Sequence, residues 1–273
     1  MSERAQHLEE VARARAGDRV RKVGYPIGIR KLEVLRREEL SPRMVRVTLG
    51  GPGIEGFESH VADEHIRLAF PDAGTGELRL PVPAGELLDW PRPRPPSRVY
   101  TVRRHDPVAG ELDLDIVLHP GGLAADWAAS AAPGDRIHVA GPPGGVVVPD
   151  RHDRWLLAGD LSALPAIART LESLPEGATG WAFIEATERM DLRHPPGVAV
   201  QWVDDGLVEA VTRAGVTRGE RLFVWIAGES RSVAALRPWV RGELGVGPAD
   251  SSLTGYWKRG LTDFEEEFDD DAP

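Results

Sequence analysis

Residues 112–118 read LDLDIVL, and this stretch decides the fold class of the first half of the chain. Its apolar residues recur at every second position, which is the period of a β-strand with one buried face. The apolar face would consist of Leu112, Leu114, Ile116 and Leu118. The opposite face would carry Asp113, Asp115 and Val117. The stretch therefore predicts a strand of a sheet that has one apolar side.

Similar short runs, separated by turns, occupy the sequence on both sides of this stretch. They are Leu32–Leu35, Met44–Leu49, His65–Phe70, Arg98–Val102 and Arg136–Ala140. Between them, Pro81–Pro96 contains WPRPRPP, whose prolines cannot donate to a sheet, so we expect a loop there. The whole pattern favours an antiparallel barrel or sandwich.

After the turn-rich residues 141–145 and the polar residues 149–153, the pattern changes to strand, turn and helix. The expected strands are Trp155–Ala158, Trp181–Glu185, Val198–Val203, Leu222–Ala227 and Leu253–Trp257. We expect a helix near Leu164–Leu174 and another after the fourth strand. This alternation is typical of a parallel sheet with covering helices.

A chain of 273 residues favours two domains over one large core. We expect an N-terminal extension with a short helix at 1–30 and a β domain at 31–150. An α/β domain would follow at 151–262. The acidic stretch at 263–273 is typical of a solvated tail, and we assign it no function.

The composition excludes several kinds of site. The chain has no cysteine, which excludes disulfides, thiolate metal sites and cysteine nucleophiles, so redox chemistry needs a bound cofactor. The eight histidines lack metal-ligand spacing, and a net charge of -10 argues against nucleic acid. No apolar run is long enough to cross a bilayer and no signal peptide is visible, so we expect a cytoplasmic protein.

The segment Arg98–Val99–Tyr100–Thr101 offers three groups that a flavin needs. Tyrosine supplies a flat surface, threonine a hydrogen-bond partner, and arginine a cation for the phosphates. Taken alone, so short a pattern is more often part of an ordinary β-strand.

A second candidate segment begins at His119 and reads HPGGLAADWAASAAPGD. Gly121 and Gly122 precede a predicted helix at 123–131, where free N–H groups could meet a pyrophosphate. A simple loop before a helix explains the same residues.

Taken in order, six segments resemble the siderophore-interacting proteins, also called ferric-siderophore reductases. The segments are RVYTVR, HPGGLAADWA, PGDRIHVAGPPGG, LLAGDLSALPAI, WIAGES and GYWKRG. The resemblance extends from about Lys31 to Gly260. It implies an antiparallel Greek-key β-barrel of the ferredoxin-reductase type that binds FAD, followed by a reductase-type α/β domain.

The resemblance also implies which residues bind the cofactor. In the barrel these are Arg98, Val99, Tyr100, Thr101, Val117, His119, Gly122, Leu123, Ala124, Ala125 and Trp127. In the second domain they are Asp160, Ser162, Tyr256 and Trp257. The family often has serine where Ala125 stands and glutamate where Leu161 stands.

The donor of electrons is less clear from the residues than the flavin. Only Gly159 stands where a dinucleotide cradle would be rich in glycine, and Asp160 follows it at the helix entrance. The resemblance implies NAD(P)H or a ferredoxin-like carrier as the donor of electrons. The substrate implied by the resemblance is a ferric siderophore, with Lys258, Arg259 and Arg103 as its candidate ligands.

The resulting expectation is an FAD-dependent oxidoreductase that frees iron as Fe(II), with electron transfer by the flavin and no catalytic side chain. Two alternatives stay open. One is a flavin reductase with a non-iron acceptor. The other is a siderophore-binding protein without redox activity. The departures from the family pattern at Ala125 and Leu161 support this alternative.

Overall fold

The computed structural model describes residues 3–219 and 221–261, so the acidic stretch at 263–273 lies outside the described residues. The described chain forms two compact units. One unit comprises residues 3–11 and 22–146, and the other comprises residues 12–21 and 147–261. The chain begins with helix α1 (Glu3–Arg15). Within these ranges, no helix has the length and apolar character that a bilayer crossing requires.

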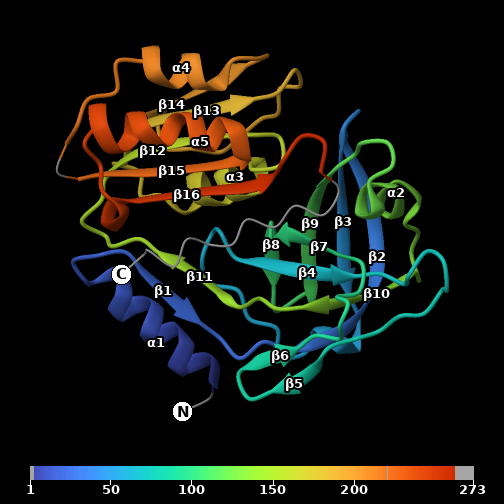
Figure 1. The fold of residues 1–273 in the computed structure, drawn as a ribbon. Coiled ribbons are helices and arrows are strands. Elements are labelled where there is room, and N and C mark those ends of the chain that lie inside the picture. Colours follow the sequence, from blue (N-terminus) through green and yellow to red (C-terminus); the bar gives the residue numbers. More distant parts are fainter. Residues whose placement is uncertain (1–2, 220, 262–273) are drawn as a thin grey trace. The chain divides into compact units, whose positions relative to one another are not determined.

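The first unit is built on an antiparallel sheet with the strand order β7-β4-β10-β2-β3-β9-β8 (Figure 1). Its strands are β2 (Ile29–Ser41), β3 (Met44–Gly50), β4 (His65–Ala69), β7 (Ser97–Thr101), β8 (Arg104–Asp106), β9 (Glu111–Val117) and β10 (Arg136–Ala140). The connections from β3 to β4 and from β9 to β10 skip neighbouring strands, as in a Greek key.

The two ends of this strand order are consecutive in the chain. β7 and β8 are separated only by Val102 and Arg103. The Arg103 N–H donates to the Asp113 carbonyl of β9 at 2.9 Å, and the Val102 N–H donates to the Glu64 carbonyl at 2.8 Å. The sheet therefore curls until its ends meet, which confirms the barrel expected from the sequence.

The face of β9 that points into the barrel is apolar, as the alternation predicts. Leu112, Leu114 and Ile116 are each 0% exposed. On the other face, the Arg46 guanidinium donates two bonds to Asp115, at 2.6 and 2.8 Å. The buried acids of this strand are thus held by charge-assisted hydrogen bonds, which offset their desolvation.

Two short pairs of strands lie in segments for which we expected loops. Within the expected loop at 81–96, β5 (Val82–Ala84) and β6 (Leu87–Asp89) form a hairpin, so that expectation was wrong for these residues. The turn-rich 141–145 contains the start of β11 (Gly144–Val147), which pairs with β1 (Arg21–Gly24). The sequence did not predict either pair, because both lie among turn residues. A two-stranded ribbon can form without the apolar alternation by which the other strands were predicted.

The second unit holds a parallel sheet with the order β14-β13-β12-β15-β16, which confirms the expected fold class. Its strands are β12 (Arg154–Asp160), β13 (Thr179–Glu185), β14 (Gly197–Val203), β15 (Leu222–Glu229) and β16 (Ser251–Trp257). Its helices are α3 (Leu164–Ser173), α4 (Leu207–Arg213) and α5 (Ser230–Pro238), and α5 continues into the π-helical turn η2 (Trp239–Glu243).

Helices cover both faces of this sheet (Figure 1). α4 and α5 share a hydrophobic core with one face, in which Leu156 and Val224 are 0% exposed. α3 lies on the other face, where Gly159 gives it room: a Cβ there would lie 2.5 Å from the Ala163 Cβ. The strand order reverses between β12 and β15, and ligands of open α/β sheets bind outside the carboxyl ends of strands at such a switch point.

Candidate functional site

Strand β7 carries the first candidate segment. In its register with β4, Arg98 lies opposite Leu68 and Tyr100 opposite Ile66, so Arg98 and Tyr100 share one face. Tyr100 packs against the barrel core. Burial raises the pKa of Tyr100 to about 12, against the opposing effect of the Arg98 cation, so the phenol is neutral at pH 7.

The second candidate segment forms helix α2 (Leu123–Ser130) and the turn before it. Gly122 is the N-terminal cap residue, and no side chain caps the helix. A Cβ on Gly122 would lie 2.2 Å from His119 Cε1, so the absence of a side chain lets the His119 ring lie over this turn. The first intrahelical bond at this end runs from the Asp126 N–H to the Gly122 carbonyl, at 2.7 Å.

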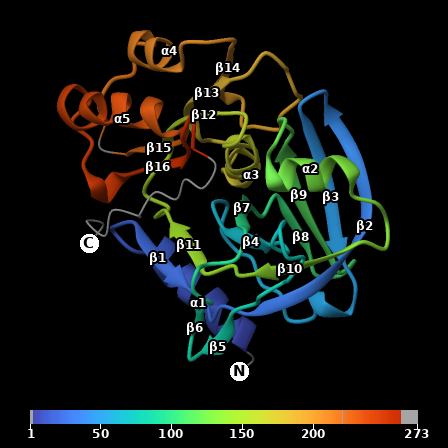
Figure 2. The ribbon, with the colours of Figure 1, turned by 45° about the vertical axis from the view of Figure 1, so that its right-hand side comes forward.

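The structure brings these two segments together in one unit. α2 contacts β3, β7 and β9, and Figure 2 shows it beside β9 and β3. The Trp127 ring of α2 packs edge-on against Phe70 with 6.0 Å between centroids. The Phe70 N–H donates to the Pro96 carbonyl, immediately before β7. Arg98 and the start of α2 therefore belong to one region of the barrel.

The groups in this region suit the chemistry of FAD. The N–H groups of Leu123, Ala124 and Ala125 have no carbonyl one turn earlier, and a helix start favours a pyrophosphate. Arg98 adds a cation, and Tyr100 a neutral aromatic ring. Ala125 is 2% exposed, so its methyl group packs inside the barrel unit.

Four further predicted cofactor residues lie in the same elements. Val99 is 42% exposed on β7, whereas Thr101 is 8% exposed at the end of that strand. Val117 ends β9, and Leu123 begins α2 and packs on the barrel core. Contact of these residues with a cofactor stays a prediction.

Two residues on β4 were missed by sequence reasoning. His65 lies opposite Thr101, and Arg67 lies opposite Val99. Burial, together with the Arg67 and Lys22 cations, lowers the pKa of His65 to about 4, so its imidazole is neutral at pH 7. Only strand pairing places these side chains beside the flavin segment, and the strand-like run His65–Phe70 was the available signal.

Arg103, a predicted substrate ligand, lies against a carboxylate of its own unit. Its Nε is 3.6 Å from Asp115 Oδ2, and 15% of its side chain is exposed. It is thus a second cation on a carboxylate that Arg46 already binds. A role toward substrate stays a prediction for Arg103.

In the second unit, Asp160 is the centre of a hydrogen-bond cluster at the end of β12. Its Oδ1 accepts from the Ser162 N–H at 2.8 Å and the Ser162 hydroxyl at 2.5 Å. Its Oδ2 accepts from the Glu229 N–H at 2.7 Å and from Trp257 Nε1 at 2.8 Å. Direct contact of Asp160 or Ser162 with the adenine end of FAD stays a prediction, and these four bonds already occupy the carboxylate.

Carboxylates also close two helix N-termini at this edge of the sheet. Glu229 Oε2 accepts from the Arg231 and Ser232 N–H groups at the start of α5. Glu185 Oε1 accepts from the Leu207 N–H at the start of α4, at 3.1 Å. These helix ends are therefore occupied by internal anions, unlike the start of α2.

The GYWKRG segment spans the end of β16 and the turn after it. Tyr256 packs edge-on against Trp225, with 6.3 Å between ring centroids. Trp257 is 37% exposed, although its indole N–H is bound to Asp160. Lys258 is half-buried and Arg259 is exposed. Neither cation forms an ion pair within residues 3–219 and 221–261.

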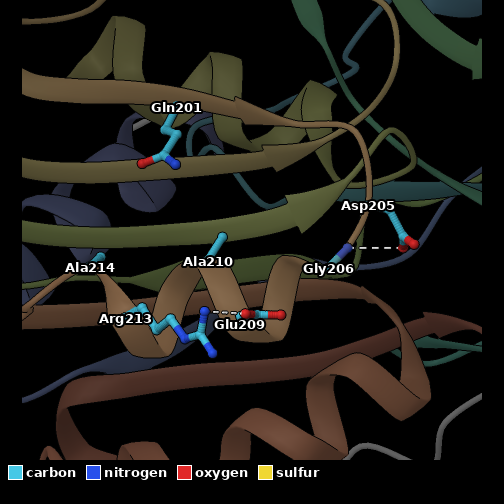
Figure 3. A pocket seen from close by; sticks show the side chains of 7 residues that line it. All are labelled: Gln201, Asp205, Gly206, Glu209, Ala210, Arg213 and Ala214. Carbon is cyan, nitrogen blue, oxygen red and sulfur yellow. Dashed lines mark hydrogen bonds and ion pairs between the residues drawn. The ribbon is translucent and has the colours of Figure 1, made fainter.

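A shallow hollow of about 440 Å³ lies elsewhere in the second unit, against α4 and the edge strand β14. Figure 3 shows Glu209 and Arg213 paired with each other across one turn of α4. Asp205 accepts from the Gly206 N–H. The hollow contains no residue of the candidate segments, and its charges are paired internally, so we assign it no part in the site.

Comparison with known families agrees with this geometry. Residues 33–146 match the siderophore-interacting FAD-binding domain, and residues 152–260 match the siderophore-interacting protein domain. The chain belongs to the siderophore-interacting protein family. The first match covers β7 and α2, so the barrel that contains the donor set is the FAD-binding domain of this family.

Individual relatives cover nearly the whole chain. The ferric vibriobactin reductase ViuB of Vibrio cholerae is 35% identical over 251 residues, 86% of this chain and 90% of that protein. The NADPH-dependent ferric-chelate reductase of Escherichia coli is 35% identical over 245 residues, 86% of this chain and 95% of that protein.

Solved structures support the fold. A siderophore utilization protein from T. fusca has a TM-score of 0.83 and 37% identity, and the match covers 90% of this chain and 98% of that one. A ferredoxin NADP+ reductase from Neisseria gonorrhoeae has a TM-score of 0.57 at 13% identity and shows only that the fold is of the ferredoxin-reductase type.

Proposed function

We propose that this protein is an FAD-dependent reductase of ferric siderophores that takes its electrons from NAD(P)H and releases iron as Fe(II). One observation carries the proposal: the barrel places the Arg98 cation and the open N-terminus of α2 in one region. The names of its relatives support a ferric chelate as acceptor and NADPH as donor. The proposed location is the cytoplasm, where NAD(P)H is available.

The barrel residues would bind and orient the cofactor. Arg98 and the N–H groups of Leu123 and Ala124 would hold its pyrophosphate. Tyr100 would place a neutral aromatic ring beside the flavin. Thr101 would offer its hydroxyl to the flavin as a hydrogen-bond partner. FAD supplies both two-electron chemistry with a nicotinamide and one-electron chemistry with a metal.

The second unit would contribute the contacts to the ferric chelate. Lys258 and Arg259 carry positive charge at the end of β16, and Trp257 presents an exposed aromatic face next to them. An anionic chelate would be attracted by this local charge although the chain has a net charge of -10.

The electron count sets the stoichiometry. NAD(P)H gives up two electrons and becomes NAD(P)+, with release of a proton, and each Fe(III) accepts one electron. One NAD(P)H therefore serves two ferric chelates. Hard oxygen ligands hold Fe(III) more tightly than Fe(II), so reduction weakens the chelate and frees the metal.

Anaerobic stopped-flow mixing tests the proposal. The protein is loaded with FAD, reduced with NADPH, and mixed with a ferric catecholate or hydroxamate in the presence of a ferrous-specific chelator. We expect reoxidation of the flavin absorbance together with formation of the ferrous chelate. No reoxidation and no ferrous chelate with any donor would reject the proposal, and faster turnover with quinones would favour a non-iron acceptor. Parallel assays with NADH, NADPH and reduced ferredoxin identify the donor.

A visible spectrum decides between this enzyme and a binding protein without redox activity. We expect the purified protein to show flavin absorbance, or to gain it on addition of FAD. A colourless protein that still binds ferric siderophore would support the binding protein instead.

A further inference from the structure

Three parallel strands end beside one another at the switch point of the second unit. β12 ends at Asp160, β15 ends at Glu229, and β16 ends at Trp257, with β15 paired to both other strands. The Asp160 carboxylate accepts one hydrogen bond from the end of β15 and one from the end of β16. A single side chain thus connects three strand ends that are separated by 69 and 97 residues in the sequence.

The segment Trp257–Arg259 is held at two points. Trp257 Nε1 donates to Asp160 Oδ2 at 2.8 Å, and the Arg259 N–H donates to Glu229 Oε1 at 3.2 Å. Glu229 is itself fixed, because its N–H donates to Asp160 and its other carboxylate oxygen caps α5. Lys258 lies between the two fastened residues.

The backbone at Gly228 is adapted to this arrangement. Gly228 has a φ of +128°, a region that side-chain-bearing residues rarely adopt. A Cβ at this position would lie 2.5 Å from Asp160 Oδ2. Strand β15 therefore approaches the Asp160 carboxylate closely only because residue 228 is glycine.

We propose that Asp160 and Glu229 are positioning residues, which hold the aromatic face of Trp257 and the cations Lys258 and Arg259 in place for an anionic ferric chelate. This inference rests on the proposed function. The two acids do not contact the chelate in this scheme. They fix the backbone from which the two cations extend, so less conformational freedom is lost when the chelate binds.

The indole N–H resonance of Trp257 gives a direct test that needs no substrate. Trp257→Phe assigns the resonance in a nitrogen–proton correlation spectrum. We expect Asp160→Asn to shift this resonance upfield and to speed exchange of the indole proton with water. An NH2 group replaces one of the two carboxylate oxygens, so the indole N–H loses a charged acceptor. Glu185→Gln is the matched control: it changes a carboxylate at the end of β13 that accepts from Leu207 and does not contact the segment.

Steady-state kinetics with ferric citrate and one ferric catecholate test the consequence for substrate. We expect Asp160→Asn to raise KM for the chelate about tenfold with kcat changed less than about twofold, because uniform binding is lost. Glu229→Gln should give a smaller rise, since a glutamine oxygen can still accept one of the three bonds. Glu185→Gln should leave both constants unchanged.

A double-mutant cycle tests whether Asp160 acts on KM through Trp257, and two further variants keep the test decisive if one variant misfolds. If Asp160 acts through the indole, Asp160→Asn adds nothing to KM in the Trp257→Phe background. Trp257→Phe and Glu229→Gln leave the Asp160 carboxylate in place, so they decide the matter if Asp160→Asn does not fold.

The inference is overturned if Asp160→Asn leaves the Trp257 resonance where it was, or if Asp160→Asn and Glu185→Gln change KM alike. Failure of the proposed function looks different. In that case the wild-type protein reduces no ferric chelate, while the resonance still reports whether Asp160 holds Trp257.

Discussion

The start of α2 in the barrel unit differs from the starts of α4 and α5 in the α/β unit. In the barrel unit, α2 begins at Gly122 and no side chain caps it. In the α/β unit, Glu229 caps α5 and Glu185 binds the first N–H of α4. The start of α2 can therefore receive an anion on its backbone, whereas the starts of α4 and α5 are already bound by carboxylates of their own unit. The third helix of the α/β unit, α3, begins without a side-chain cap. Lys258 and Arg259 are the cationic side chains that the α/β unit offers to an anion at the end of β16.

A carboxylate cap on α2, like the one that Glu229 provides for α5, should have the largest effect, a loss of FAD affinity. Gly122→Asp places a carboxylate at the cap of α2, in a backbone conformation with φ −86° that aspartate accepts. We expect FAD affinity to fall about a hundredfold, because the new charge competes with the pyrophosphate for the same N–H groups. Fluorescence titration with FAD measures this change.

Gly122→Ser is the control for this substitution, since both new side chains displace the His119 ring and only aspartate adds charge. We expect serine to weaken FAD binding much less than aspartate. Equal losses in the two variants would show that displacement of His119, not charge, is responsible.

Acid should destabilise the barrel unit through His65. Its pKa is about 4 in the folded protein, against about 6.5 in an unfolded chain. Between these pH values the unfolded chain binds more protons, so the free energy of unfolding falls as the pH falls, by on the order of 2 kcal/mol.

His65→Gln should flatten this part of the pH profile in urea titrations performed between pH 4 and 7. The remaining slope would include His152 of the α/β unit, whose pKa is also lowered by burial and by the Arg151 cation. An unchanged profile in His65→Gln would exclude His65 as a source of acid sensitivity.

Removal of the carboxylate cap of α5 should lower the stability of the protein and leave FAD binding nearly unchanged. Glu229→Ala removes a side chain that accepts from three backbone N–H groups, and we expect a loss of about 1 kcal/mol in the free energy of unfolding. FAD affinity should change little, because the groups proposed to hold the pyrophosphate, Arg98 and the start of α2, lie in the other unit. A loss of FAD affinity in this variant would contradict the separation of the two roles.

The smallest expected effect is a gain in FAD affinity. Ala125→Ser adds a hydroxyl on α2, and one added hydrogen bond is worth roughly 0.5 to 1.5 kcal/mol. We expect FAD to bind a few times more tightly, measured by the same titration. A weaker affinity would mean that the 2% exposed position has no room for the hydroxyl.

The sequence predicted more of the candidate site in the barrel unit than in the α/β unit, for a physical reason. The alternation in β9 and the glycines before α2 are local signals, because a strand face and a helix start are set by residues near in sequence. The antiparallel β domain and the parallel sheet were predicted in this way, whereas the FAD-binding role of the barrel was implied by the family resemblance.

The Asp160 cluster could not be predicted from the same signals. Its members end three different strands, and only the strand order of the folded sheet makes Glu229 and Trp257 neighbours of Asp160. For the same reason His65 was read as a scattered histidine, although β4 pairs it with Thr101. Pairings between distant strands are what the linear pattern leaves open.

The place of β10 between β4 and β2 has a consequence for the order in which the protein is made. Without β10 the barrel is open between β4 and β2, and its two parts meet where β7 continues through Val102 and Arg103 into β8. The ribosome completes the RVYT segment about forty residues before it completes β10 at Ala140. A nascent chain halted at residue 132 would carry both flavin motifs, yet it would lack the strand that closes the barrel supporting them.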